Sequence, residues 1–375
     1  FDLSGGQMQR VAIASVLVMR PDVMILDEPT SQLDPEGSDE VFRAVETLTN
    51  SGITILMIEQ KIEKLAAYCD RILLLHGGKQ IVFDTPQKVF SMPDLADYGI
   101  QEPAFTRICK AEHVTLPDGT YPVTVEEAAG VLKERHAGRA EAKGASKADK
   151  KKDSEVLGEE QFLVKNLDFS YLPDVPVLKA LNMRLDKRPT AIIGQNGAGK
   201  TTLVKLLKGL LKPVSGNIYF RGEDISGKTV AMLAGNVGYV FQNPDDQIFK
   251  YNVMDEIMFG PMNIGMDPKR AEEEAKRALE LTGLSGKEKE NPYDLELYER
   301  KMTAIASVLA MDTDVLILDE PTNDLDIQTL TILEDYLDHF DGIILIVSHD
   351  RYFLDRTVSR IFAFNGGGKI RQSEG

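Results

Sequence analysis

The stretch from Gly194 to Thr202 combines closely spaced glycines with a lysine and two hydroxyl side chains. Its order fits G-x-x-x-x-G-K-[ST], in which glycines let the backbone approach phosphate oxygens. In this pattern Lys200 reaches the β- and γ-phosphates, and the Thr201 hydroxyl is placed for Mg²⁺. The residues expected to contact a nucleotide are Gly194, Gln195, Asn196, Gly197, Ala198, Gly199, Lys200, Thr201 and Thr202. The sequence therefore predicts a nucleoside triphosphate site.

The flanks of this stretch predict the elements that must hold it. Residues 190–193 are a short apolar run typical of a buried strand, and Leu203, Leu206 and Leu210 follow at helical spacing. A loop between a buried strand and a helix N-terminus presents backbone N–H groups and the positive helix end to phosphate. A chance glycine-rich turn is the alternative, but it would not account for the strand and the helix on its two sides.

Composition limits the classes of partner. The 375 residues allow two or three domains, and a net charge of −16 argues against nucleic acid or an anionic membrane surface as the main partner. Cys69 and Cys109 form no disulfide framework, so the sequence favours a reducing cytoplasm. No apolar run approaches the roughly 20 residues that span a bilayer, so we expect no membrane insertion and any membrane role through a partner.

An internal repeat relates two parts of the chain at a constant offset of 292 positions. Residues 12–17 match 304–309, and Asp-Glu-Pro-Thr at 27–30 matches the same four residues at 319–322. Each Asp-Glu pair ends an apolar run, which suits a parallel sheet buried on both faces with acids at its carboxyl edge. The chain opens inside the first copy, so we expect a fragment that lacks about 130 residues of that copy, with its phosphate loop.

The predicted fold class is α/β, with a mostly parallel sheet around the phosphate loop and two copies of one domain, the first incomplete. A helical subdomain is expected near residues 251–310. The expected domains are the carboxyl-terminal part of the first copy at 1–93, a small module at 94–135, a flexible linker at 136–159 and the second copy at 160–375.

Leu-Ser-Gly-Gly-Gln at residues 3–7, followed by the strand that ends at residues 27–30, resembles the signature and Walker B motifs of ABC ATPases, which are P-loop NTPases. Residues 240–249 and 259–261 are similar to the energy-coupling ATPases of vitamin and cobalt importers, in particular those with two fused halves. This resemblance implies an ATPase that energises import of a vitamin or of cobalt or nickel ions. Its membrane-spanning subunits would bind at Gln242–Gly260 and hold it at the cytoplasmic face of the membrane.

The resemblance also implies roles for residues. Two ATPase domains of this family close head to tail on each ATP, with the phosphate loop of one facing the signature of the other. The signature residues expected to face the second copy's loop are Ser4, Gly5, Gly6 and Gln7. Asp319 and Gln242 are expected to hold Mg²⁺ together with the loop threonine, and Glu320 to orient or deprotonate the attacking water. His349 would touch the γ-phosphate, and Tyr171 would stack on adenine.

The other composite site is expected to be degenerate. Where the first copy has its signature, the second has Glu-Leu-Tyr-Glu at residues 296–299. Carboxylates there would repel phosphate, and larger side chains remove the close approach that glycine permits. Gln60 takes the place of the switch histidine in the first copy when one gap is allowed. We therefore expect one competent and one degenerate site, with independent drift as the alternative.

The tail resembles a different group. Residues 323–326, 348–354 and 364–371 look more like the ABC-F translation factors. The sequence therefore leaves open a ribosome-associated factor, a hybrid of two genes, a divergent importer ATPase, or a fragment without function of its own. Residues 241–249 and the acidic charge favour the importer.

Overall fold

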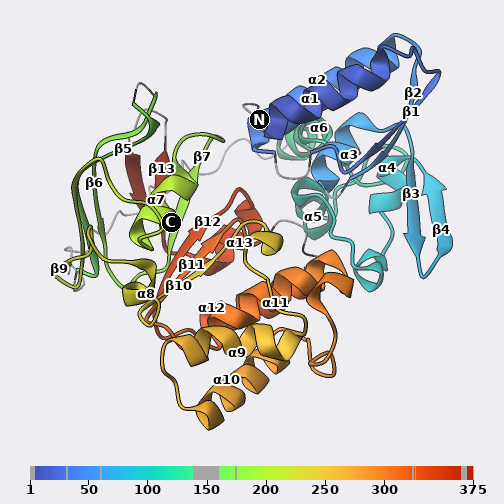
Figure 1. Cartoon of the computed structure of the whole chain (residues 1–375). Helices are drawn as coiled ribbons and strands as arrows, with labels where there is room; N and C mark the ends of the chain where they lie inside the picture. The colour runs from blue at the N-terminus through green and yellow to red at the C-terminus, as the bar shows by residue number, and fades with distance from the viewer. Residues whose placement is uncertain are drawn as a thin grey trace. The chain divides into compact units, whose positions relative to one another are not determined.

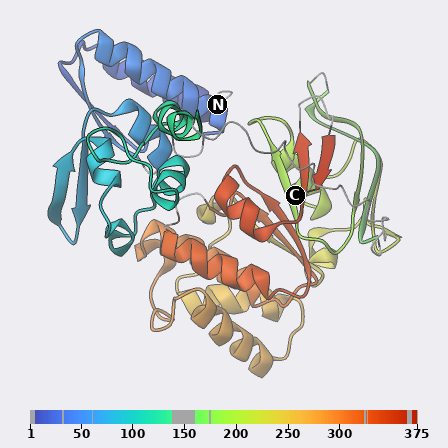
Figure 2. The same cartoon turned by 180° about the vertical axis from the view of Figure 1, so that it is seen from behind.

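The computed structural model describes residues 5–30, 33–59, 61–137, 160–173, 175–322, 325, 327–364 and 370–374. The chain forms two compact units, Phe1–Ser154 and Glu155–Gly375 (Figures 1 and 2). Each unit has its own hydrophobic clusters.

A mostly parallel sheet organises the second unit, in the order β10-β11-β12-β7-β13-β14. Its strands are β7 (Thr190–Gly194), β10 (Val237–Val240), β11 (Val315–Asp319), β12 (Ile343–Val347), β13 (Arg360–Phe364) and β14 (Ile370–Glu374). Neighbouring strands run parallel except β14, which is antiparallel to β13. Every residue of β11 and β12 is buried, as expected for strands covered on both faces. The predicted parallel sheet around the phosphate loop is confirmed.

A second, antiparallel sheet covers part of this unit and was not predicted. It comprises β5 (Phe162–Leu172), β6 (Val175–Leu185), β8 (Ser215–Phe220) and β9 (Glu223–Asp224), in the order β6-β5-β8-β9. Its inward side chains share one hydrophobic cluster with the parallel sheet and with α7 (Lys200–Leu207). The helix after the phosphate loop is therefore packed between two sheets. The short α8 (Val230–Leu233) precedes β10.

Helices form the remaining part of the second unit (Figure 1). They are α9 (Val253–Asn263), α10 (Pro268–Leu281), α11 (Leu297–Leu309), α12 (Ile327–Asp338) and α13 (Arg351–Thr357), with single turns η2 (Pro244–Asp246) and η3 (Pro292–Asp294). Helices α9, α10 and α11 pack against one another, and their apolar faces join a cluster with β11 and β12. This confirms the helical subdomain predicted near residues 251–310.

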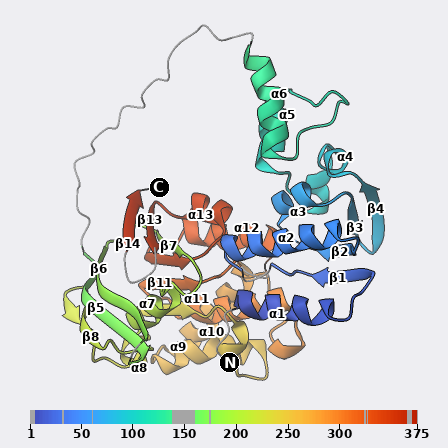
Figure 3. The same cartoon turned by 90° about the horizontal axis from the view of Figure 1, so that it is seen from above.

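The first unit repeats the order of elements seen at the end of the second. It contains α1 (Gly5–Leu17), β1 (Val23–Asp27), α2 (Pro35–Asn50), β2 (Thr54–Ile58), α3 (Ile62–Tyr68), β3 (Ile72–His76) and β4 (Lys79–Asp84). These elements follow the same succession as α11-β11-α12-β12-α13-β13-β14. β1 pairs with β2 in parallel (Figure 3), as β11 does with β12. Four further elements follow: α4 (Pro86–Phe90), η1 (Leu95–Tyr98), α5 (Ala104–Ala111) and α6 (Val125–Ala137).

Several predictions concern residues outside the described part of the chain. These are Ser4, Gln60, Asn323, Asp324 and Asp326, nearly all of the expected linker, and residues 365–369 of the tail. Among the helices that the structure does describe, none is long and apolar enough to cross a membrane.

Candidate active site

The phosphate loop joins the end of β7 to the start of α7. Gly194 has a φ of +147°, and a Cβ there would lie 2.5 Å from the Phe364 carbonyl oxygen. Gly199 has a φ of +97°, and a Cβ there would lie 2.8 Å from the Leu178 side chain. Both positions therefore need glycine, because the backbone conformation and the close packing exclude a side chain.

Lys200 is the first residue of α7 and is only 6% exposed. Its Nζ donates to the carbonyl oxygens of Gly194 at 2.7 Å and Gln195 at 3.1 Å. The same ammonium lies 3.1 Å from His349 Nε2, which comes from the loop after β12. The lysine thus folds back over the loop, with its ammonium hydrogen-bonded to two loop carbonyls beside His349.

Asp319 ends β11 with its carboxylate held in a fixed orientation. Thr201 donates to Oδ1 at 3.1 Å, and the buried Tyr239 hydroxyl donates to Oδ2 at 2.7 Å. Burial raises the pKa of Asp319 against the effect of these hydrogen bonds. The Thr201 and Asp319 oxygens are hard donors that fit Mg²⁺. Among the described residues there is no cluster of three or more His, Cys, Asp or Glu that could hold a metal ion.

Glu320 follows β11 in a left-handed backbone conformation, with a φ of 48°. Such a conformation costs on the order of 1–3 kcal/mol for a residue other than glycine and persists where the surroundings enforce it. Here the Glu320 N–H donates to the Val347 carbonyl at 2.8 Å, and Oε1 lies 3.3 Å from His349 Nε2. Burial raises the pKa of Glu320 to about 7, although the nearby Lys200 opposes the shift. A carboxyl group of this pKa can act as a general base near neutral pH.

Gln242 is exposed and joins this cluster through its backbone. Its carbonyl oxygen accepts a hydrogen bond at 2.8 Å from Lys301 Nζ, which also donates to the Glu320 carbonyl at 2.9 Å. Lys301 is 0% exposed and was not selected by the sequence analysis. The only signal in the sequence was its place in the repeat, where Lys301 matches Gln9.

Tyr171 lies on β5 beside the phosphate loop, with its side chain 59% exposed. Its hydroxyl is 3.3 Å from Thr202 Oγ1, and its ring packs edge-on against Phe169 at 4.9 Å. The structure therefore holds an accessible aromatic ring at the edge of the loop. An aromatic face there can stack on a nucleobase.

The start of α11, where the first copy has its signature, is capped by carboxylates of the chain itself. The Glu296 N–H donates to Glu299 Oε2 at 3.2 Å, and Glu299 also pairs with Lys287. Burial opposes ionisation, but the hydrogen bonds from Lys287 and the backbone keep the pKa of Glu299 below its ordinary value. The start of this helix is therefore bonded to a carboxylate of its own chain, which is in turn paired with Lys287.

One prediction about the segment after Gln242 was wrong. The partner-binding hypothesis for Gln242–Gly260 requires exposed apolar residues, and Ile248 and Phe249 are the ones that the sequence suggests. Ile248 is only 2% exposed, because it turns into the core of the unit. Phe249 is 52% exposed, its ring meets Phe259 edge-on at 4.5 Å, and Lys250 Nζ lies 4.4 Å from the Phe259 ring centre. The buried Glu256 accepts hydrogen bonds from the N–H groups of Phe249 and Lys250 and so fixes this loop.

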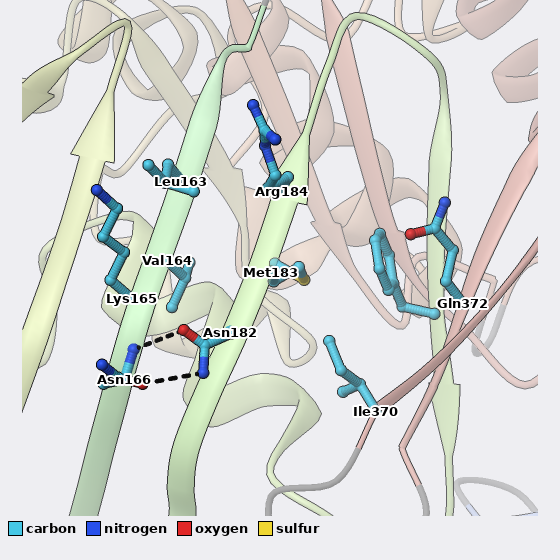
Figure 4. A pocket seen from close by; sticks show the side chains of 10 residues that line it. Leu163, Val164, Lys165, Asn166, Asn182, Met183, Arg184, Ile370 and Gln372 are labelled. Atoms are coloured by element: carbon cyan, nitrogen blue, oxygen red, sulfur yellow. Dashed lines mark hydrogen bonds between the residues drawn. The ribbon is translucent and has the colours of Figure 1, made fainter. Parts of the chain in front are cut away.

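A cavity of about 630 Å³ lies elsewhere in the second unit, between the antiparallel sheet and β13–β14 (Figure 4). Its lining residues are Leu163, Val164, Lys165, Asn166, Asn182, Met183, Arg184, Phe362, Ile370 and Gln372. Asn166 and Asn182 are joined by two hydrogen bonds at its wall. None of these residues belongs to the cluster around Lys200, so the cavity is not part of the candidate site.

Comparison with known proteins gives consistent matches. The family model described as "ABC transporter" matches residues 1–31 and 178–323. A putative ABC transporter ATP-binding protein of Methanosarcina acetivorans is 32% identical, over 98% of this chain and 62% of its own length. One with the same description from Clostridium tetani is 30% identical, over 97% of this chain and 80% of its own length.

A solved structure is also similar. The structure of cbiO1 from Clostridium perfringens, described as part of the ABC transporter complex cbiONQ, is 32% identical with a TM-score of 0.51. The match covers 58% of this chain and 89% of that one. This chain spans 62% to 65% of the length of several of the curated relatives that it matches.

Proposed function

Because the chain belongs to the ABC transporter family of ATP-binding proteins, we propose that it binds ATP with Mg²⁺ at the phosphate loop and hydrolyses it. The observation that carries this proposal is the connected cluster in which Lys200 and Glu320 both lie within 3.3 Å of His349 Nε2. A phosphate-facing ammonium, a carboxyl of neutral pKa and an imidazole are thereby gathered at the ends of adjacent parallel strands. This is the set of groups that phosphoryl transfer to water requires.

The roles of the residues follow from their chemistry. Lys200 and the backbone N–H groups of the loop bind the phosphates, and Tyr171 stacks on the base. Thr201, Asp319 and Gln242 would hold Mg²⁺, which supplies positive charge to the phosphate oxygens. Glu320 orients a water molecule and accepts its proton, and His349 binds the γ-phosphate.

We further propose, from the sequence resemblance, that Ser4, Gly5, Gly6 and Gln7 act as the family's signature and complete the phosphate contacts. The first copy ends its strand with the same Asp-Glu pair, but a site that used the start of α11 would meet Glu296 and Glu299. One competent and one degenerate site is the arrangement that these residues support.

The proposed biological role is to energise import of a micronutrient, either a vitamin or cobalt or nickel ions, through separate membrane subunits. Residues 240–249 support it, as does the likeness to cbiO1, which is described as part of a transporter complex. The relatives are described as transporter ATP-binding proteins, which does not favour a ribosome-associated factor. In this role the protein would lie at the cytoplasmic face of the membrane.

Nucleotide binding is tested by titrating a fluorescent ATP analogue against the chain and its Lys200→Ala variant. The variant loses the charge that faces the β- and γ-phosphates, so affinity should fall by about tenfold or more. Lys212→Ala, at an exposed lysine of the same unit, is the matched control and should bind normally. If the Lys200→Ala variant bound the ATP analogue with unchanged affinity, the assignment of the phosphate loop would be contradicted.

For the membrane partner, the surface formed by Phe249, Lys250 and Phe259 offers exposed aromatic rings and a cation within Gln242–Gly260. An exposed aromatic surface of this kind suits the apolar face of an amphipathic helix of a membrane subunit. Phe249→Glu should abolish copurification with those subunits while binding of the ATP analogue stays within about twofold, because the ring lies outside the nucleotide cluster. Copurification that survives Phe249→Glu would place the partner elsewhere.

A further inference from the structure

Lys301 is a buried lysine whose position joins two separate segments of the second unit. It lies on α11, between residues of the hydrophobic cluster such as Met302 and Ile305, and its side chain is 0% exposed. A buried ammonium is costly unless it is hydrogen-bonded. Its Nζ donates to the carbonyl oxygens of Gln242 and Glu320, at 2.8 Å and 2.9 Å. One group thus fixes the loop after β10 and the turn after β11 together.

The two carbonyls belong to residues that the proposed reaction uses. The Glu320 peptide is held on both sides, by its own N–H to Val347 and by its carbonyl to Lys301. Its left-handed conformation has to be enforced by such contacts. Gln242 has an exposed side chain and an anchored carbonyl. Lys301 therefore acts on the backbone of both residues.

Comparison of the two copies of the repeat shows that the buried lysine is present only in the second. Glu28 has nearly the same φ as Glu320, 43° against 48°, and its N–H donates to Ile58 as that of Glu320 does to Val347. At the position of Lys301, however, α1 has Gln9, which is half-buried. The second copy places a charged donor where the first has a neutral amide. A charge-assisted hydrogen bond is the stronger of the two.

We propose that Lys301 is a positioning residue for ATP hydrolysis, which couples the backbone of Gln242 to that of Glu320. The proposal rests on the proposed function of this site. The competing explanation is that Lys301 only stabilises the fold. Lys208 provides the comparison, since it is 7% exposed and its ammonium donates to the Val237 carbonyl in the same unit.

The test measures kcat, KM for ATP and thermal unfolding of the full chain and its variants. Lys301→Met should lower kcat by about tenfold or more and leave KM within about threefold, because the nucleotide contacts remain. Lys208→Met should lower thermal stability to a similar degree and leave kcat within about twofold. Lys301→Gln, a shorter and neutral donor, should have an intermediate kcat at an unchanged KM.

A second measurement reports the coupling itself. If Lys301 acts through Gln242 and Glu320, the loss caused by Lys301→Met should be smaller in a Gln242→Ala background than in the wild type. Additive losses would contradict the proposal, as would equal loss of kcat from Lys301→Met and Lys208→Met. If Lys301→Met does not fold, Lys301→Gln decides, and wild-type kcat for that variant overturns the proposal. Phosphate release that does not depend on Lys200 would instead overturn the proposed function, and this inference with it.

Discussion

Glu28 and Glu320 occupy matching places in the two copies. Comparing them separates the backbone conformation, which the shared motif determines, from the burial and contacts of the side chain, which the surrounding residues determine. Both follow a parallel strand, both adopt a left-handed conformation, and both donate their N–H to the next strand. Their surroundings differ: Glu320 is 6% exposed and lies against His349, whereas Glu28 is half-buried. The Asp-Glu-Pro-Thr motif therefore has the same backbone turn in both copies, but its glutamate lies in a different electrostatic environment in each.

The strands before these glutamates differ in the same way. Val23 and Ile25 of β1 are 57% and 67% exposed, while the matching Val315 and Ile317 of β11 are 0% exposed. In the described residues β1 pairs only with β2 and is packed on one face against α1 and α2. β11 lies between β10 and β12, under α7 on one face and α11 on the other. The burial of the glutamate at the carboxyl end of the strand thus depends on which strands and helices cover that strand.

The largest expected effect tests whether the two glutamates are equivalent. Glu320→Gln should lower steady-state phosphate release by about 100-fold or more, because the water loses its base while ATP still binds. Glu28→Gln, the matched substitution in the first copy, should leave it within about twofold. The measurement is steady-state phosphate release by the two matched variants and the unmodified protein. Equal losses of phosphate release from the two variants would mean that both sites hydrolyse ATP, and would contradict the proposal of one competent and one degenerate site.

A smaller effect is expected from the groups that hold Asp319. Tyr239→Phe removes the hydroxyl that orients Oδ2 and keeps the ring, which packs edge-on against Phe241. Losing such an outer contact should raise the Mg²⁺ concentration needed for half-maximal binding of the ATP analogue by about tenfold. Tyr336→Phe, at a tyrosine on α12, is the control. An unchanged Mg²⁺ requirement would show that Thr201 alone fixes the carboxylate.

The last prediction concerns pH. Burial raises the pKa of Glu320 to about 7, so the carboxyl is increasingly protonated below that pH and cannot accept a proton from water. We expect kcat/KM for ATP hydrolysis to fall about tenfold for each pH unit well below 7 and to level off above it. The same raised pKa means that the native state binds the proton more tightly than the unfolded state between pH 4.5 and about 7. This group's contribution to stability should therefore diminish as pH rises through that window. A pH profile that is flat between 5.5 and 8 would contradict the assignment of Glu320 as base.

The parts of the molecule that follow from local patterns of residues could be predicted from the sequence alone. The spacing of glycines with Lys200 predicts the loop, since this order lets a backbone turn from a strand into a helix around phosphate. The apolar runs before Asp27 and Asp319 predict parallel strands, and the constant offset between them predicts two copies of one domain. Each of these signals can be read from the order of residues without knowing which segments pack together.

Which side chains distant in the sequence come into contact depends on how the helices and strands pack together. Tyr239 and Lys301 could not be selected from the sequence, because a tyrosine or lysine in an apolar segment acquires its partner only when β10, β11 and α11 pack together. Ile248 was misplaced for the same reason: its neighbour Phe249 is equally apolar, and only the turn held by Glu256 determines which of the two faces solvent. The raised pKa of Glu320 likewise follows from burial under neighbouring layers, and burial is a property of the packed layers that no short motif contains.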